Sequence, residues 1–138
     1  MRFKTLAALI FGSLVLSIAS AATVNYTAIS APDGQQDTIL VTWTPLLNGD
    51  TGQSATIAQY ADRTVQAIGT FGSGGSVQLE GSDDGVTWTT LTDLGGTTIV
   101  KTVTGGMSVV AENPRFIRPN VTAGDGTTSI TVTVIGKR

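Results

Sequence analysis

Short runs of alternating apolar and polar residues, separated by glycine clusters, cover all but the N-terminal part of the chain. In residues 38–44, Ile39, Val41 and Trp43 take every second position, which is the period of a strand with one buried face. Residues 129–135 alternate in the same way. No window holds apolar residues at the i, i+3, i+4, i+7 spacing of a helix. The pattern predicts an all-β domain, either a sandwich or a barrel.

About nine short strands are expected, which is enough for two packed antiparallel sheets. Pro45 is expected to end the first strand, and Pro119 is expected at an edge or a bulge because it lacks an N–H. The expected strands lie at residues 38–44, 54–60, 63–71, 76–81, 86–92, 97–104, 107–111, 115–121 and 129–135.

The clearest hairpin joins the fourth and fifth of these strands through residues 82–85, where Gly85 is free to take a positive φ. A loop of this length sets Leu79 opposite Trp88, with both on the buried face. The positions expected on the outer face are Gln78, Glu80, Thr87 and Thr89.

Residues 1–21 form an apolar N-terminal segment. Arg2 and Lys4 precede an apolar run over residues 6–18, and small residues follow it up to Ala22. These are the three parts of a secretory signal peptide, with cleavage expected after Ala21. The run is short for a membrane span, which needs about 20 apolar residues. The alternative is a retained segment that is buried or lies at a membrane surface, and any membrane contact is expected through it alone.

Residues 22–37 have turn chemistry, with the sequence APDG at residues 31–34, and little apolar periodicity. They are interpreted as a mobile or partner-dependent arm. The β-sandwich domain is therefore expected to span residues 38–138.

The composition excludes several kinds of chemistry. The chain of 138 residues has no cysteine and no histidine. Disulfides, thiolate nucleophiles, cysteine-type zinc sites and Ser-His-Asp triads are therefore absent. The net charge of −2 argues against a nucleic-acid partner, which requires a basic stripe. No cofactor and no small-molecule substrate are expected.

The acidic residues offer little support for catalysis or metal binding. Most of them lie beside glycine in turns, where the local hydrogen bonds of aspartate explain them. Glu80 lies within a confidently predicted strand and points outward. Residues 48–52 and 124–127 are rich in oxygen ligands, but neither segment fits the twelve-residue calcium loop. The prediction is a chain that is not an enzyme and holds no metal.

The low charge favours contact with another protein. Only 13% of residues are charged, and interface cores are depleted in charge. Arginine and tyrosine are enriched in interfaces, so Tyr60, Arg115 and Arg118 are interface candidates. Arg115 and Arg118 are three residues apart on one strand and are expected on opposite faces. Local ion pairing, for example with Glu112, is the alternative explanation.

Two stretches carry a resemblance to a known group of proteins. Residues 77–91, VQLEGSDDGVTWTTL, are similar to a hairpin common in structural proteins of tailed phages, and residues 115–129, RFIRPNVTAGDGTTS, resemble the C-terminal pattern of the same group. The resemblance covers about residues 54–138. It implies a capsid decoration (cement) protein with a jelly-roll-like sandwich. Such a protein would bind the major capsid protein on the outer surface of the virion, as a homo-oligomer.

In that case, the N-terminal segment would be an arm docked against capsid subunits, with Phe11, Leu14 and Leu16 as contact residues. The alternative function is a secreted or cell-surface β-sandwich, either an adhesin or a carbohydrate-binding module. It rests on the signal-like segment and on the hairpin, which also resembles parts of discoidin-type domains. A hydrolase is the third hypothesis.

Overall fold

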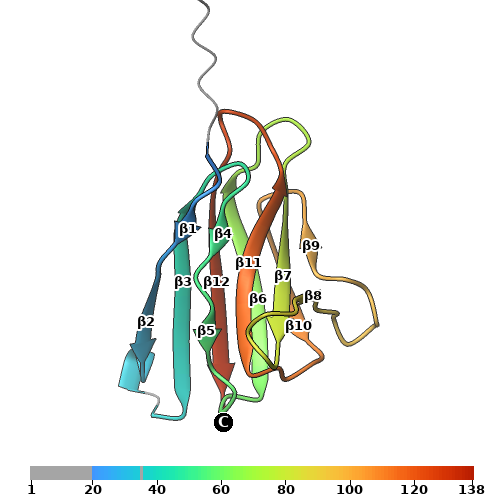
Figure 1. The fold of residues 1–138 in the computed structure, drawn as a ribbon. Coiled ribbons are helices and arrows are strands. Elements are labelled where there is room, and N and C mark those ends of the chain that lie inside the picture. The colour runs from blue at the N-terminus through green and yellow to red at the C-terminus, as the bar shows by residue number, and fades with distance from the viewer. Residues whose placement is uncertain (1–19, 35) are drawn as a thin grey trace, which may run out of the picture.

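The fold was analysed in a computed structural model that describes residues 20–34 and 36–138. Two sheets pack face to face and confirm the predicted all-β sandwich (Figure 1). The larger sheet has the order β1 (Thr23–Val24), β4 (Thr51–Gly52), β11 (Phe116–Ala123), β7 (Ser76–Ser82) and β8 (Thr89–Thr90), with β5 (Ala55–Thr56) beside β11 and β9 (Val100–Lys101) beside β7. The smaller sheet has the order β10 (Gly105–Val110), β6 (Asp62–Thr70), β12 (Ser129–Lys137), β3 (Thr38–Leu46) and β2 (Tyr26–Ser30).

The strand order is that of a jelly roll. From β3 onward, the chain crosses to the other sheet after every strand except β7, which is followed by its own neighbour β8 in the larger sheet; here β4 with β5 and β8 with β9 are each taken as one interrupted strand. One sheet then reads β3-β12-β6-β10, and the other reads β4/β5-β11-β7-β8/β9. This is the order of a double Greek key closed into two sheets.

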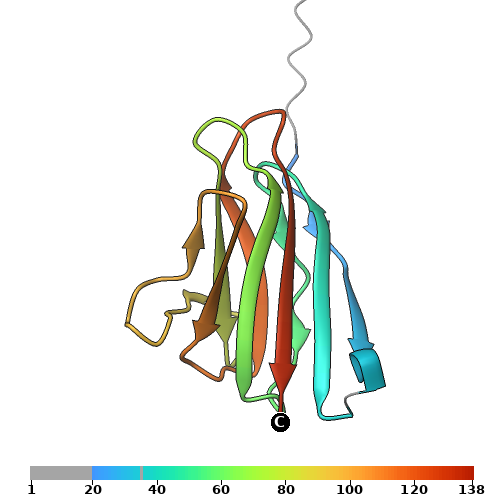
Figure 2. The ribbon, with the colours of Figure 1, turned by 180° about the vertical axis from the view of Figure 1, so that it is seen from behind.

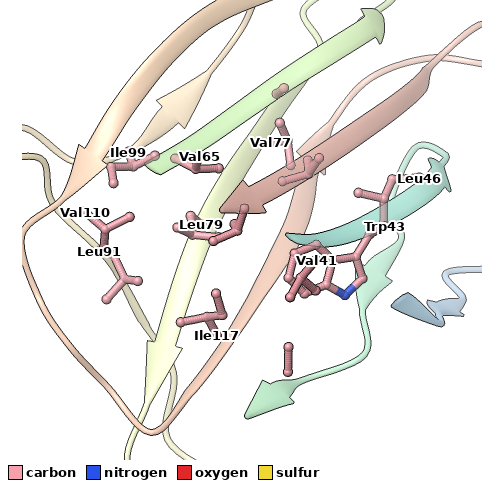
Figure 3. Close-up of a cluster of buried hydrophobic side chains, with 14 of the residues drawn as sticks. Val41, Trp43, Leu46, Val65, Val77, Leu79, Leu91, Ile99, Val110 and Ile117 are labelled. Atoms are coloured by element: carbon pink, nitrogen blue, oxygen red, sulfur yellow. The ribbon is translucent and has the colours of Figure 1, made fainter. Parts of the chain in front are cut away.

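The alternation of apolar residues places the core between the sheets. Val41 and Trp43 of β3 are fully buried and face Leu79 of β7 and Ile117 of β11 (Figure 3). The indole Nε1 of Trp43 donates a hydrogen bond of 2.8 Å to the carbonyl oxygen of Gln53, so its polar atom has a partner. The large buried side chains therefore come from the strands that the sequence pattern identified best.

Pro45 does not end the first strand, contrary to the prediction. β3 continues to Leu46, which is buried and pairs with Ile130. The register shifts between Ile130 and Val132, opposite Pro45. A bulge at this point accommodates the residue that has no N–H to give to the ladder.

The expected strand at residues 54–60 is mostly irregular. It is regular only in β5, and residues 57–61 form a loop at one end of the sandwich. The expected strand at residues 97–104 shortens to β9, and residues 46–53, where no strand was expected, contain β4. Apolar residues in these segments, such as Ile57 and Ile99, are buried in the core without a continuous ladder.

The buried guanidinium of Arg63 holds this irregular end together. Arg63 is 1% exposed, and burial lowers its pKa. Its Nε donates to the Tyr60 carbonyl at 2.7 Å, and one terminal nitrogen donates to the Ile57 carbonyl at 2.9 Å. Both terminal nitrogens also reach the Pro114 carbonyl, at 3.2 and 3.3 Å. Arg63 thereby satisfies backbone oxygens that no ladder serves.

The expected arm at residues 22–37 contains two edge strands of the sandwich. β1 pairs in parallel with β4, and β2 pairs along its whole length with β3. Tyr26 packs edge-on against Trp43, with ring centroids 6.0 Å apart. Backbone pairing of this kind leaves little trace in the apolar pattern, which explains why the sequence predicted an arm.

Pro119 lies in a central strand rather than at an edge of the sheet. The N–H of Val121 donates to the Asp50 carbonyl, so the nitrogen of Pro119, two residues earlier, faces the same side of β11. On that side the partner strand is interrupted between β4 and β5. The interruption removes the need for the missing donor.

The expectations for Phe11, Leu14 and Leu16, and those for the rest of the N-terminal run, lie outside the described residues. Within the part of the chain that the structure describes, no helix is long and apolar enough to span a membrane.

We expect Arg63→Met to lower the free energy of unfolding by about 2–4 kcal/mol, because it removes the side-chain donor of the Tyr60 and Pro114 carbonyl oxygens and one of the two donors of the Ile57 carbonyl oxygen. Urea unfolding followed by tryptophan fluorescence measures the change. The control is Arg115→Met on the exposed surface, with an expected change within about 0.5 kcal/mol. Equal effects of the two substitutions would contradict the role given to Arg63.

Candidate functional site

Two surfaces of the sandwich are candidates for function, one on the outer face of each sheet. On the larger sheet, polar and aromatic side chains gather where β7 and β11 lie side by side. We call this group the Glu80 cluster, and its members are Gln78, Glu80, Trp88, Arg118 and Asn120.

The members of the Glu80 cluster satisfy one another. Glu80 pairs with Arg118 across the strands, and Arg118 Nε donates to Glu80 Oε2 at 2.8 Å. Gln78 and Asn120 donate to Glu80 Oε1 at 2.7 and 2.9 Å. The guanidinium carbon of Arg118 lies 3.9 Å from the centroid of the Trp88 ring. This is a cation–π contact that covers the ion pair, so that Glu80 is 6% exposed.

The cluster places Trp88 on the outer face, where the sequence predicted a core residue. Glu80 pairs with Thr90, and the Leu91 N–H donates to the Leu79 carbonyl, so Leu91 takes the buried position opposite Leu79. The register differs from the expected one by three residues, and an odd shift moves a side chain to the other face. Gly85 has the positive φ that was expected, 76°.

Hydrogen bonding controls the charge of Glu80. Burial by itself raises the pKa of Glu80, but the hydrogen bonds from Asn120, Arg118 and Gln78 and the positive charge of Arg118 outweigh it and lower the pKa below its usual 4.5. Glu80 is therefore held as a carboxylate.

An open hollow of about 490 Å³ lies between the loop after β7 and residues 112–114, and no member of the Glu80 cluster lines it. Its carboxylates are already engaged. Asp84 accepts hydrogen bonds from the N–H groups of Val86 and Thr87, both at 2.7 Å, and Glu112 accepts from the hydroxyl of Thr92 at 2.6 Å. These acids shape the loops that line the hollow.

The electrostatics of these acids do not suit general acid catalysis. Hydrogen bonds from the N–H groups of Val86 and Thr87 strongly lower the pKa of Asp84. Burial raises the pKa of Glu112, but hydrogen bonds from Thr92 outweigh it and lower the pKa. A general acid at neutral pH requires a raised pKa. In the described part of the chain, no group of three or more metal-ligating side chains is found.

The second candidate surface is the outer face of the smaller sheet, which Figure 2 shows from its own side. We call it the threonine face. The strand registers place thirteen uncharged side chains on it: Thr27, Ile29, Leu40, Thr42, Thr44, Thr64, Gln66, Ile68, Met107, Val109, Thr131, Thr133 and Ile135.

Neighbouring threonines on this face bond to one another. The hydroxyls of Thr44 and Thr131 are 2.6 Å apart, and those of Thr42 and Thr133 are 3.5 Å apart. Charges enter only at one end, where Asp62 and Lys137 are paired in register. This face costs less to desolvate than a charged surface.

The structure separates the three interface candidates of the described region. Tyr60 is 3% exposed and belongs to the core, so it is corrected to a core residue. Arg118 pairs with Glu80 on the outer face, and local ion pairing thus accounts for it. Arg115 is exposed just before β11, and its guanidinium carbon lies 4.8 Å from the Phe116 ring centroid.

The threonine face was indicated by the low charge and the threonine content, but its position depends on strand order. Trp88 and Asn120 were missed as members of a site. The pairing of β7 with β11 brings together residues about 40 positions apart, and no local pattern signals it.

No family model matches the chain, and no curated protein matches it. A similar solved structure is that of Peruvianin-I, described as a cysteine peptidase from Thevetia peruviana latex. The two chains are 13% identical with a TM-score of 0.45, and the alignment covers 99% of this chain and 78% of that one. A likeness of this size carries no conclusion about activity.

We expect Glu80→Gln to lower the free energy of unfolding at neutral pH by about 1–3 kcal/mol, because it weakens charge-assisted hydrogen bonds. Since the pKa of Glu80 is lower in the folded chain than its usual 4.5, the charged form stabilises the fold above about pH 4.5. That contribution is lost as the pH falls through the folded pKa.

Urea unfolding between pH 3 and 7 measures the effect. The difference between the wild-type protein and Glu80→Gln is expected to shrink below about pH 4.5. Asp62→Asn, at an exposed position outside the cluster, is the control and should show a smaller difference. A difference for Glu80→Gln that is constant with pH would contradict the assignment.

Proposed function

We propose that this protein is a non-enzymatic structural protein of a tailed-phage head, a decoration protein that binds the assembled capsid through its threonine face. The observation that carries the proposal is the threonine face itself, a broad uncharged outer face on a chain that resembles phage structural proteins in its sequence. Binding to the assembled shell alone stabilises that shell by mass action, by about 2.7 kcal/mol per site at a hundredfold excess over Kd.

The size of the face supports binding as an oligomer. Five strands about 4.8 Å apart and roughly 30 Å long give an area of about 600 Å². A standard interface buries about 800 Å² on each partner. One copy would therefore bind weakly, and a symmetric oligomer that engages several capsid subunits at once gains by avidity.

The engaged carboxylates support a role without catalysis. Glu80, Asp84 and Glu112 each accept several hydrogen bonds, and the pKa of each is lowered. Groups held in this way stabilise loops and strands but are poorly placed to exchange protons with a substrate.

A second function is an exported carbohydrate-binding module or adhesin. The Glu80 cluster is the observation that favours it, because Trp88 and Asn120 are half-buried on the outer face of the larger sheet. Aromatic and amide groups are common ligands of sugars at such places. The stacking of Arg118 on the Trp88 ring makes this the weaker candidate.

We expect the purified protein to co-sediment with empty heads of the phage that encodes it. Ile68→Lys, on the threonine face, should raise the Kd for the heads at least tenfold, because it buries an unpaired charge in the interface. Ile68 is 46% exposed in the free chain, so the substitution leaves the core intact.

Val86→Lys is the matched control. Val86 is 81% exposed in the loop after β7, away from the threonine face, and the same change there should leave binding unaltered. Failure of the wild-type protein to bind heads, or equal losses from both substitutions, would overturn the proposal. Binding to a glycan array that is lost in Trp88→Ala would favour the second function instead.

A further inference from the structure

The N-terminal edge of the sandwich contains a buried carboxylate for which residues 20–34 and 36–138 supply no cation. Asp50, in the loop between β3 and β4, is 4% exposed. Its Oδ1 accepts a hydrogen bond of 2.9 Å from the backbone nitrogen of Ala22, and its Oδ2 accepts one of 2.9 Å from that of Leu47. In the described part of the chain, Asp50 forms no ion pair. A buried charge of this kind is costly unless an opposite charge meets it.

The contact with Ala22 coincides with the point where the sheet begins. The carbonyl of Ala22 accepts from the Thr51 N–H at 2.9 Å, and the carbonyl of Val24 accepts from the Gln53 N–H at 2.7 Å. Ala22 is therefore the first residue with both backbone groups bonded to the β4 side, whereas Ser20 and Ala21 are exposed and precede β1.

The sequence independently marks the same peptide bond. The apolar run ends in small residues, and the pattern expected for a leader peptidase is satisfied by cleavage between Ala21 and Ala22. The bond is accessible in the fold, because residues 20–22 are exposed. Two independent observations therefore concern the nitrogen of Ala22. The sequence pattern predicts that cleavage frees this nitrogen, and the structure shows that it donates a hydrogen bond to the buried carboxylate of Asp50.

We propose that residues 1–21 are removed and that the new ammonium group of Ala22 forms an ion pair with the buried carboxylate of Asp50. Hydrolysis of the Ala21–Ala22 bond by a peptidase consumes one water. It leaves a carboxylate on Ala21 and an amine on Ala22, which takes up a proton at neutral pH. The ammonium keeps the donor already directed at Oδ1 and adds the missing positive charge, so processing stabilises the folded domain.

Removal of residues 1–21 by a leader peptidase accompanies export, so this inference agrees with the second function, the exported module. A decoration protein processed in this way would bind capsids without the docking arm expected at residues 1–21. Of the two alternatives for residues 1–21, a leader that is removed and an arm that is retained, the proposal adopts the first.

The first test is the intact mass of the full chain expressed in bacteria with its own N-terminus. The expected mass is that of residues 22–138. The mass of the uncleaved chain, or of a chain that begins at another residue, overturns the proposal.

The second test measures the ion pair in the processed protein. Acetylation of the Ala22 amine near pH 7, verified by peptide mapping, removes the charge but keeps an N–H donor. It should lower the Tm of the wild-type protein by about 3 °C or more and leave the Tm of Asp50→Asn unchanged. Equal shifts in the two proteins, or no shift in the wild type, overturn the ion pair.

Asp125→Asn is the matched control. Asp125 also accepts backbone N–H groups in a loop, from Ser73 at 2.6 Å and Thr127 at 2.8 Å, but it forms no hydrogen bond with the nitrogen of Ala22, which donates to Asp50. This variant should lose Tm on acetylation as the wild type does. It keeps the test decisive if Asp50→Asn does not fold, because loss of the acetylation effect in Asp125→Asn would also contradict the pairing.

Discussion

Burial of one face of each sheet against the other is the constraint on which this structure depends. The chain has no cysteine, so no disulfide assists the packing of Trp43, Leu79 and Ile117 between the sheets. Because the inner faces are committed to the core, what residues 20–34 and 36–138 offer to another molecule lies on the two outer faces, at the sheet edges and in the end loops. The outer faces differ in kind, since one carries an ion pair under an indole ring and the other carries uncharged side chains except at the end where Asp62 and Lys137 pair.

Where strands stop, polar groups replace the ladder. Arg63 binds the carbonyls of one irregular end, and Asp125 and Asp50 bind N–H groups at the other end. In each case, a side chain supplies the hydrogen bond that a neighbouring strand would have supplied. Acidic residues such as Asp50 and Asp125 therefore bond to the backbone of loops. These hydrogen bonds hold the long, glycine-rich loops in place. Because the carboxylates are engaged in them, the arrangement supports a binding role more than a catalytic one.

The two proposals concern separate regions of the molecule. The threonine face lies on the smaller sheet, whereas Ala22 and Asp50 lie at the start of the larger one. Processing at Ala22 would complete the domain before or during its assembly with a partner. Strand β2 links the two regions, because it continues from β1 and forms one edge of the threonine face through Thr27 and Ile29. A well-anchored N-terminus would therefore help to keep that edge in place.

The alternation of Ile39, Val41 and Trp43, and of Ile130, Val132 and Val134, was enough to determine the fold class and most of the core, because a strand with one buried face leaves a two-residue period. The excluded chemistries also followed from composition alone. The tertiary structure decided the rest. Trp88 changed faces because seven residues (82–88), and not the expected four, separate the paired residues Gly81 and Thr89, which shifts the register by an odd number. Tyr60 became a core residue. Residues 23–30 became edge strands, since backbone pairing needs no apolar pattern. The Glu80 cluster and the Ala22–Asp50 contact join distant segments, and such contacts depend on strand order, which local sequence does not encode.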